Sequence, residues 1–320
     1  MEALAATLAV LGLALLIDVV LGEPPLRVHP TAWMGWLTAR WCRVAPERGP
    51  PIQRAYGVLL AMATILIFVG AAYLLLEVAA RFFGETIRIA IAAILLKSTF
   101  SIRLMQRYAV QLASAVRRND YVEARAILRH IVRRDPEQLN DSQVISAGVE
   151  TIAESTADGI TSPLFYFALF GVPGAFAYRA INTLDSMVGY KTPELVNIGW
   201  FSAKLDSIAN WIPARLTAVL TVLSTVLISG SASNSWRILL RDRNKTESWN
   251  AGWLMSAMAG ALEARLEKPG FYTLGDADQS LTHENLAKAG RAMAVNTALF
   301  VFLVVIPIMI IIRMAGLQID

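Results

Sequence analysis

The run Tyr56–Leu76 places the strongest constraint on the fold, because it is uncharged and a membrane-spanning helix needs about 20 predominantly apolar residues. The composition agrees: of the 320 residues, 55% are hydrophobic and 17% are charged. The mean hydropathy is +0.49, which is not typical of a soluble domain. The sequence therefore predicts a polytopic integral membrane protein.

Five other apolar segments bring the predicted total to four to six membrane segments. They are Leu4–Leu21, Ile89–Leu96, Ile160–Ala177, Leu216–Ile228 and Thr297–Ile312. No Lys or Arg precedes the first and no small-x-small cleavage site follows it, so we expect it to be retained. The second predicts either a short span or a helix that leaves the bilayer. Prolines and glycines interrupt the third, as in a broken or re-entrant segment shielded by protein.

The remaining sequence predicts helices, so the expected fold class is all-α, in one membrane-embedded domain over 1–320. No alternation typical of strands and no internal repeat is visible. Residues 97–135 change to a charged amphipathic pattern, in which Asn119 and Asp120 separate a first helix from a second over Tyr121–Val132. We expect a helical hairpin there.

Basic residues indicate the orientation. Segments 22–55 and 231–296 both carry several Lys and Arg residues, and the positive-inside tendency places such segments in the cytoplasm. An even number of crossings must then separate them. We expect a multi-pass protein of the cell membrane, whose hairpin, loop region 231–296 and active site face the cytoplasm.

Charge and cysteine content exclude several classes of protein. The formal net charge is only +4 and no long basic run occurs, so no nucleic-acid partner is expected. Cys42 is the single cysteine, which excludes an intrachain disulfide and a cysteine-based metal cluster. The sequence also has no Walker A pattern, no dinucleotide fingerprint and no Gly-x-Ser-x-Gly elbow.

Polar residues without an evident structural reason concentrate in region 145–217, which we take as the principal site. Glu150, Glu154 and Asp158 recur every four residues, so one α-helix would carry three carboxylates on one face. Like charges at this spacing repel unless a cation neutralises them, and Mg²⁺ that holds phosphates is a common choice. The alternative is a solvated acidic face.

Two pairs of an acid and an amide follow at membrane boundaries. Asn182 and Asp185 are three residues apart and would share a helix face. Asp206 and Asn210, four apart, repeat the arrangement. Polar pairs at the edge of a bilayer are costly without a partner, so they predict a functional role. Helix capping or interhelical hydrogen bonding is the alternative.

Two further positions are candidates for binding. His29 stands alone in a proline-rich loop, where the alternative is an ordinary hydrogen-bonded histidine. Arg133 belongs to a basic cluster with Arg129 and Arg134, which suits bidentate binding of a phosphate. A solvated basic helix end is the alternative there.

Several sequence motifs together resemble the adenosylcobinamide-phosphate synthase family of cobalamin biosynthesis, of the CobD/CbiB type. They are Asp18–Gly35, Ile131–Asp135, Asn182–Tyr190, Asn210–Thr217, and Asn250–Gly252 followed by Ala257–Ala261. These motifs are long, occur in the order typical of the family and span most of the chain.

The resemblance implies a membrane enzyme that uses ATP to join a carboxylate of adenosylcobyric acid to the amine of aminopropanol phosphate or a related amino-alcohol phosphate. The corrinoid, the amino-alcohol phosphate and ATP would be its substrates, with Mg²⁺ as cofactor and membrane lipid around the helices. A homo-oligomer, or association with other membrane proteins of the cobalamin pathway, is left open.

Under this resemblance the polar residues divide into two groups. The catalytic candidates are Glu150, Glu154, Asp158, Asp185 and Asp206, of which Glu154, Asp158 and Asp185 are also the candidate Mg²⁺ ligands. The candidates for binding substrate or phosphate are His29, Arg133, Asn182, Lys191, Asn210, Arg215 and Asn250. The sequence does not rank metal ligand against base.

The chain departs from the family pattern at three places. The motif around Glu154 and Asp158 keeps both acids but loses an asparagine, and Asp206 is followed by Ser207 where a second acid is usual. Thr246–Asn250 replaces a His-Pro-Ser-Pro-Asn motif and loses its histidine and both prolines. These losses leave open a paralogue with a changed substrate. Two other classes remain: a non-catalytic membrane sensor or accessory protein, similar to the beta-lactamase-induction proteins, and a transporter.

Overall fold

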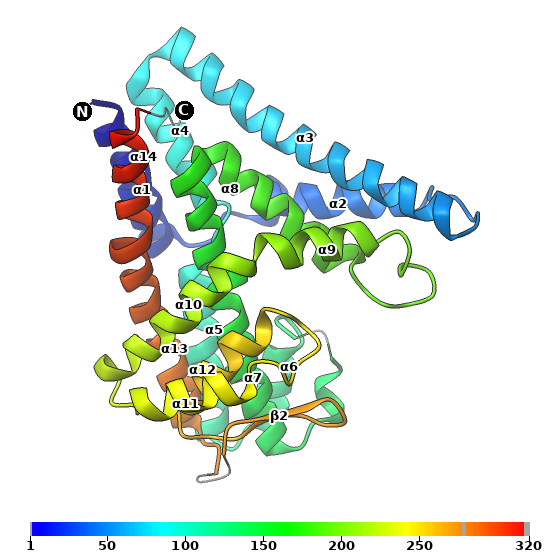
Figure 1. Cartoon of the computed structure of the whole chain (residues 1–320), viewed down its shortest axis with the longest axis vertical. Coiled ribbons are helices and arrows are strands. Elements are labelled where there is room, and N and C mark those ends of the chain that lie inside the picture. The colour runs from blue at the N-terminus through cyan, green and yellow to red at the C-terminus, as the bar shows by residue number, and fades with distance from the viewer. Residues whose placement is uncertain (1, 133, 277–279, 317–320) are drawn as a thin grey trace. The chain divides into compact units, whose positions relative to one another are not determined.

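The computed structural model describes residues 2–132, 134–276 and 280–316. The chain forms two compact units (Figure 1). Unit 1 comprises Met1–Ser101, Ser162–Ala209 and Val304–Asp320, and unit 2 comprises Ile102–Thr161 and Asn210–Leu303. Both units are built almost entirely from helices, which confirms the all-α class.

Unit 1 is organised around α3 and α8. Its helices are α1 (Glu2–Leu21), η1 (Leu26–Val28), α2 (Pro30–Cys42), α3 (Pro50–Phe83), α4 (Glu85–Lys97), α8 (Ser162–Val188), α9 (Trp200–Ala209) and α14 (Ile306–Met314). α3 packs against α8, α1 packs against α4, and α2 and α9 both pack on α8. Gly57 permits a close approach to Ile198, because a Cβ at this glycine would lie 2.0 Å from the Ile198 carbonyl oxygen.

Unit 2 is organised around α12 and α13. Its elements are α5 (Ile102–Arg117), α6 (Tyr121–Leu128), η2 (Pro136–Gln138), α7 (Asp141–Thr156), a π-helical turn (Ala157–Thr161), α10 (Trp211–Ser224), η4 (Thr225–Leu227), α11 (Ala232–Asp242), α12 (Ala251–Ala261), β1 (Leu266–Lys268), β2 (Tyr272–Leu274) and α13 (His283–Phe300). α13 packs against α5, α7 and α10, whereas α12 packs against α7, α10 and α11. Asn140 and Thr282 start α7 and α13 with capping boxes.

Within residues 2–132, 134–276 and 280–316, four helical segments are long and apolar enough to cross a membrane, and a bent pair makes a fifth, which confirms a multi-pass protein. The four are Ala3–Leu21, Pro50–Phe83, Asp141–Val188 and His283–Met314; the pair is Trp200–Ala209 with Trp211–Leu227, bent by 46°. The weak segment Ile89–Leu96 lies in α4, which has 13 residues and is not among them. This count falls within the predicted four to six.

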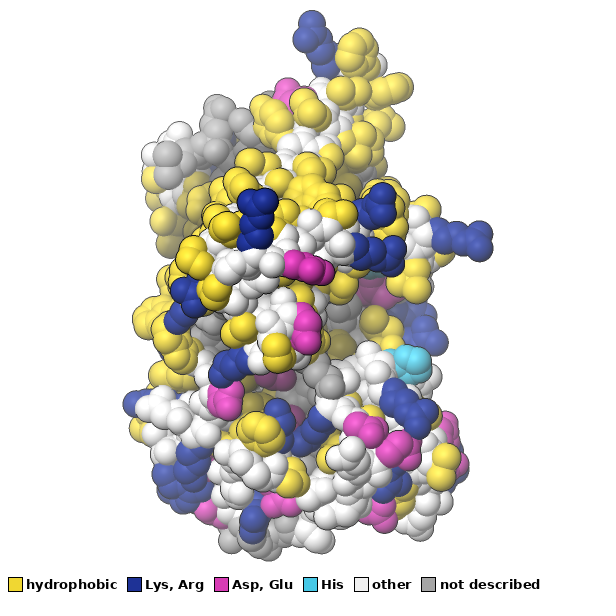
Figure 2. All heavy atoms as spheres, turned by 90° about the vertical axis from the view of Figure 1, so that its right-hand side faces the viewer, with side chains coloured by type: hydrophobic (Ala, Val, Ile, Leu, Met, Phe, Trp, Pro, Cys, Tyr) yellow, Lys and Arg dark blue, Asp and Glu magenta, His cyan; other side chains and the backbone are white. Residues whose placement is uncertain are grey.

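The candidate spans differ in how much of their surface the protein covers. In the most apolar part of Asp141–Val188, 72% of the residues are buried, against 22% for Pro50–Phe83. The first value agrees with a segment shielded by protein, and its helix is broken at Phe170 and Gly171, where Gly171 has φ +65°. Figure 2 shows apolar side chains gathered over the upper part of one face, at the height of α3 in Figure 1. Such a surface suits contact with lipid.

The expected hairpin over 97–135 corresponds to α5 and α6, which pack against each other. Asn119 turns the chain with φ +57°, and the Asp120 side chain accepts a hydrogen bond from the Glu123 amide to start α6. The second helix ends at Leu128 rather than at Val132. Asn119 and Asp120 therefore mark the break that the sequence predicts.

The short hairpin that β1 and β2 form was not expected from the sequence. The two strands are antiparallel, with Leu266 opposite Leu274 and Lys268 opposite Tyr272. Each strand has three residues, which is too short for the period-2 alternation by which strands are recognised. The expectation of helices alone was wrong at this point.

Candidate functional site

Unit 1 contains a buried cluster of charges at the end of α4. The Lys97 ammonium lies 3.0 Å from Asp18 Oδ1 and 2.9 Å from Glu23 Oε1, and it donates to the Phe100 carbonyl at 3.1 Å. The side chains of Lys97 and Asp18 are 2% and 0% exposed, so this ion pair is removed from solvent. A buried cation needs partners of this kind, because desolvation alone disfavours its charge.

His29 extends this cluster. It caps the N-terminus of α2, where its Nδ1 accepts the Thr31 amide, and its Nε2 lies 3.0 Å from Glu23 Oε2. Since Nδ1 is an acceptor, the neutral ring carries its proton on Nε2 and donates to Glu23. Burial would raise the pKa of Glu23, but the hydrogen bond from His29 and the charge of Lys97 hold it below the usual value. Glu23 therefore stays ionised.

A chain of hydrogen bonds links His29 to Asp206 within unit 1. Arg179 Nε donates to Thr31 Oγ1 at 3.4 Å, and its Nη1 donates to Asn182 Oδ1 at 3.3 Å. Asn182 Nδ2 in turn donates to Asp206 Oδ1 at 3.3 Å. We name these five residues, which come from the start of α2, α8 and α9, the unit 1 relay. It brings together three residues singled out from the sequence: His29, Asn182 and Asp206.

Asp185 and Lys191 lie near the end of α8. Gly189 permits the position of the Asp185 carboxylate, because a Cβ at residue 189 would lie 2.0 Å from Asp185 Oδ1. Asp185 is half-buried, whereas Lys191 is exposed in the loop that follows α8. Both candidates therefore belong to unit 1.

Glu150 of α7 is the centre of a polar cluster in unit 2. Its carboxylate accepts hydrogen bonds from Ser146 at 2.6 Å, from Tyr272 at 2.8 Å and from Arg134 at 3.2 Å. The side chain of Glu150 is only 6% exposed. Burial and the adjacent Glu150 carboxylate raise the pKa of Tyr272, so the phenol stays protonated and donates. Arg134 therefore supplies a cation beside the Glu150 carboxylate.

Glu154 and Asp158 are half-buried and both belong to unit 2, whose segment Ile102–Thr161 contains them. Glu154 lies in α7, whereas Asp158 lies in the π-helical turn, whose wider winding interrupts the four-residue spacing. Asp185, the third candidate Mg²⁺ ligand, belongs to unit 1. Within the described ranges, no group of three or more His, Cys, Asp or Glu side chains could hold a metal ion.

Arg215 and Asn250 meet in unit 2. Arg215 Nη1 donates to Asn250 Oδ1 at 3.0 Å and to the Trp211 carbonyl at 2.7 Å. Asn210 is buried at the position before α10, where the chain bends after Ala209, so the four-residue spacing from Asp206 does not lie on one continuous helix. Arg133 lies outside the described residues.

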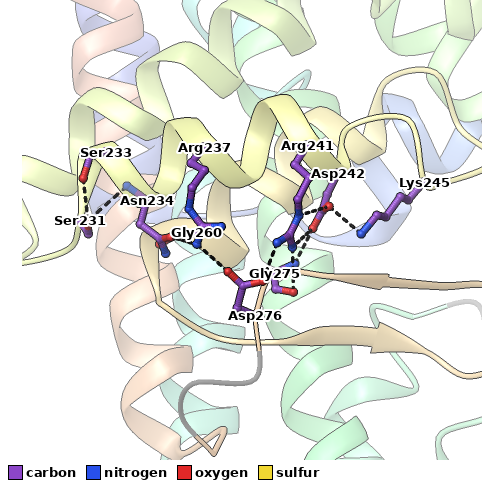
Figure 3. A network of polar contacts seen from close by, with 10 residues as sticks. All are labelled: Ser231, Ser233, Asn234, Arg237, Arg241, Asp242, Lys245, Gly260, Gly275 and Asp276. Carbon is purple, nitrogen blue, oxygen red and sulfur yellow. Dashed lines mark hydrogen bonds and ion pairs between the residues drawn. The ribbon is translucent and has the colours of Figure 1, made fainter.

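A second ion network of unit 2 joins α11 to the chain after β2 (Figure 3). Asp242 is 0% exposed and accepts from Arg241, from Lys245 at 2.6 Å and from the Gly275 amide at 2.8 Å. Asp276 bridges Arg241 and Arg237. Burial would raise the pKa of Asp242, but these partners lower it to about 2. Because every charge in this network has a partner, it fixes the β-hairpin against α11.

Sequence reasoning did not identify Thr31, Lys97, Arg179 or Tyr272 as parts of these clusters. Lys97 offered a usable signal, since it follows the apolar run Ile89–Leu96 directly. Arg179 offered another, because it lies three residues before Asn182 in α8. Tyr272 gave none, because 122 residues separate it from its partner Glu150.

Comparison with known proteins finds relatives that match most of the length of this chain. Residues 11–315 match the family described as CobD/Cbib protein. The chain is 40% identical over 292 residues to a "Probable cobalamin biosynthesis protein CobD" of Methanothermobacter thermautotrophicus, which covers 91% of this chain and 95% of the relative.

Two further relatives agree. A "Cobalamin biosynthesis protein CobD" of Dehalococcoides mccartyi is 40% identical over 264 residues, covering 82% of this chain and 85% of the relative. A "Probable cobalamin biosynthesis protein CobD" of Methanothrix thermoacetophila is 35% identical over 315 residues, covering 93% and 97%. No solved structure matches the chain.

Proposed function

The chain belongs to the CobD/CbiB family of cobalamin biosynthesis proteins, and from this premise we propose that it is an ATP-dependent acid–amine ligase. Its acid substrate is adenosylcobyric acid and its amine substrate is aminopropanol phosphate or a related amino-alcohol phosphate. The product is adenosylcobinamide phosphate. The observation that carries the proposal is the extent of the family match, which includes both units.

The reaction proceeds in two transfers. A carboxylate oxygen of the corrinoid attacks the terminal phosphorus of ATP, and the bond to the ADP oxygen breaks, which gives an acyl phosphate and ADP. The amine nitrogen then attacks the acyl carbon. A C–N bond forms, inorganic phosphate leaves with the C–O bond electrons, and a base takes the proton from nitrogen. The protein must therefore bind phosphate, orient an amine and accept one proton.

The unit 1 relay supplies groups for the amine. The Asp206 carboxylate is half-buried and oriented by Asn182. It is therefore suited to bind the ammonium group of the substrate and to accept its proton. Asp185, three residues after Asn182 on α8, is a second carboxylate for this role. His29 at the start of α2 and Arg179 in α8 hold the relay in place through their hydrogen bonds with Thr31.

Unit 2 supplies groups for phosphate and acid. Arg215, held by Asn250, suits phosphoryl oxygens. Lys191, which is exposed in unit 1, is a separate candidate for binding phosphate. Glu154 and Asp158 are half-buried carboxylates, whereas Glu150 is only 6% exposed and accepts hydrogen bonds from Ser146, Tyr272 and Arg134. We assign Glu150 to positioning of α7 and keep Glu154 and Asp158 as candidates for chemistry.

The donor set fits a Mg²⁺ ion that arrives with ATP. Mg²⁺ commonly binds one or two carboxylates together with substrate phosphates and waters, so it does not need a cluster of three protein ligands. Glu154 with Asp158, or Asp185, would supply those oxygens. The ion would neutralise charge on the phosphates.

We place the active site on the cytoplasmic side, because ATP and the basic loop region 231–296 are expected there. Association with a second copy, or with other membrane proteins of the pathway, would serve to pass on the corrinoid.

The test is a ligation assay with the full chain in detergent. ADP release is followed with Mg-ATP, adenosylcobyric acid and either aminopropanol phosphate or ethanolamine phosphate, and the corrinoid product is weighed by mass spectrometry. We expect release that needs both the acid and one amine. Asp206→Asn, which keeps the side-chain shape, should lower kcat at least about 100-fold.

The matched control is Glu47→Gln, which removes an exposed carboxylate from the same unit. It should retain wild-type turnover. Corrinoid binding without ADP release would refute the ligase in favour of the sensor, and corrinoid uptake into vesicles without ligation would refute it in favour of a transporter.

A further inference from the structure

Two arginines of unit 2 face one tryptophan ring. The guanidinium carbon of Arg215, in α10, lies 4.8 Å from the centroid of the Trp253 ring, and that of Arg243, directly after α11, lies 4.9 Å from it. Arg215 also lies 4.3 Å from the centroid of the Trp211 ring. Stacking on aromatic faces fixes both cations and leaves their N–H edges for other partners.

These two arginines differ from others of the same unit. Arg134, Arg237 and Arg241 each form an ion pair with a carboxylate. Neither Arg215 nor Arg243 has such a pair among the residues that the structure describes. Both are half-buried, so their charges are screened less by solvent than those of an exposed arginine.

Arg215 is held by neutral acceptors only. Its guanidinium donates to the Trp211 carbonyl, to Asn250 Oδ1 and, at 3.4 Å, to the Trp249 carbonyl. These bonds fix its direction without compensating its charge. Two like charges around one ring repel, and an anion that both contact removes this cost.

The start of α12 lies beside the same cations. Asn250 precedes its first turn, and Ser248 Oγ accepts the amides of Asn250 and Ala251. Gly252 packs directly on Arg243, because a Cβ there would lie 2.2 Å from the Arg243 carbonyl oxygen. The positive end of the helix dipole therefore adds to the field of the two arginines.

We propose that Arg215, Arg243 and the first turn of α12 bind the phosphate group of a substrate. This inference rests on the proposed ligase function. It deepens that function by adding Arg243 and Trp253, which were not candidate site residues in the sequence analysis, to the phosphate-binding residues. The phosphate belongs either to the amino-alcohol phosphate or to ATP. Arg243 contributes through its charge, and Trp253 positions both guanidinium groups.

The test measures binding by isothermal titration calorimetry with the full chain in detergent and chloride buffer. The probes are ethanolamine phosphate, inorganic phosphate and Mg-ATP, each added alone. We expect Arg243→Gln to lower the affinity for the probe that occupies the site at least tenfold. The probe whose affinity falls identifies the source of the phosphate. Arg117→Gln, which removes one exposed arginine from α5, is the control for net charge and should bind like wild type.

Three results would overturn the proposal: no binding of any probe to the wild type, unchanged affinity in Arg243→Gln, or an equal loss in Arg117→Gln. Arg215→Gln provides a second variant and should lower the affinity for the same probe. Ligation in the wild type with an unchanged KM in Arg243→Gln would refute this site and leave the proposed function intact. Phosphate binding that needs Arg243, without any ligation, would support this site and refute the proposed function.

Discussion

Lys97 of unit 1 and Arg215 of unit 2 are both cations held among packed helices, but their neighbours differ in charge. Lys97 lies against two carboxylates, Asp18 and Glu23, and is 2% exposed. Arg215 lies against two tryptophans and neutral acceptors. A cation whose charge is matched by the protein stabilises the fold. A cation that the protein positions but does not match is available for an anionic ligand.

The largest effect is expected from removing the matched cation. Lys97→Met should destabilise the protein by about 3–5 kcal/mol, because it leaves the buried Asp18 and the half-buried Glu23 carboxylates without their cation. Thermal unfolding in detergent, followed by size-exclusion profile, measures it.

Lys191→Met removes the same side chain from an exposed loop and is the matched control, with little expected loss of stability. Adding Glu23→Gln to Lys97→Met should restore part of the lost stability, because one buried charge is then neutral. If Lys97→Met unfolds at the same temperature as the wild type, the charge of Lys97 does not stabilise the fold.

The next largest effect is expected from acid, which protonates Asp242, a buried carboxylate that pairs with Arg241 and Lys245. Its pKa is depressed from 3.8 to about 2, so its contribution to stability is complete above pH 3.8 and is lost as the pH falls towards 2. The loss should amount to about 2 kcal/mol. Unfolding in detergent between pH 6 and pH 2 measures it.

Asp242→Asn should remove this part of the acid response, because the amide does not titrate and cannot pair with Arg241 and Lys245 as an anion. Glu23 has a depressed pKa as well, so some acid sensitivity should remain in the variant. An unaltered slope between pH 4 and pH 2 would show that the network does not stabilise the hairpin in its charged form.

The sequence predicted those parts of the fold and site that depend on local patterns. Tyr56–Leu76 falls inside the span Pro50–Phe83, and Asn119 with Asp120 falls at the turn of the hairpin. The hydrogen bond between Asn182 and Asp206 joins two residues that were each singled out by their position at a membrane boundary.

Long-range pairing was beyond sequence reasoning. Lys97 and Glu23 are 74 residues apart, and Arg241 and Asp276 are 35 apart, so no local spacing relates them. The break at Asn210 was also missed, because a four-residue spacing assumes one continuous helix. Whether a charge is matched depends on such distant partners, and the sequence could not separate Lys97 from Arg215 on this ground.

The smallest effect on stability is expected at Arg243, whose charge has no carboxylate partner among the described residues. Arg243→Gln breaks no ion pair among the described residues and should change the free energy of unfolding by less than about 0.5 kcal/mol. A ligand that binds the folded protein stabilises it by mass action, so the probe that occupies the site should raise the Tm of the wild type and not of the variant. Thermal unfolding with and without that probe measures both. A large loss of stability in the absence of ligand would mean that Arg243, like Lys97, belongs to the structural framework, and the distinction between matched and unmatched cations would fail at this residue.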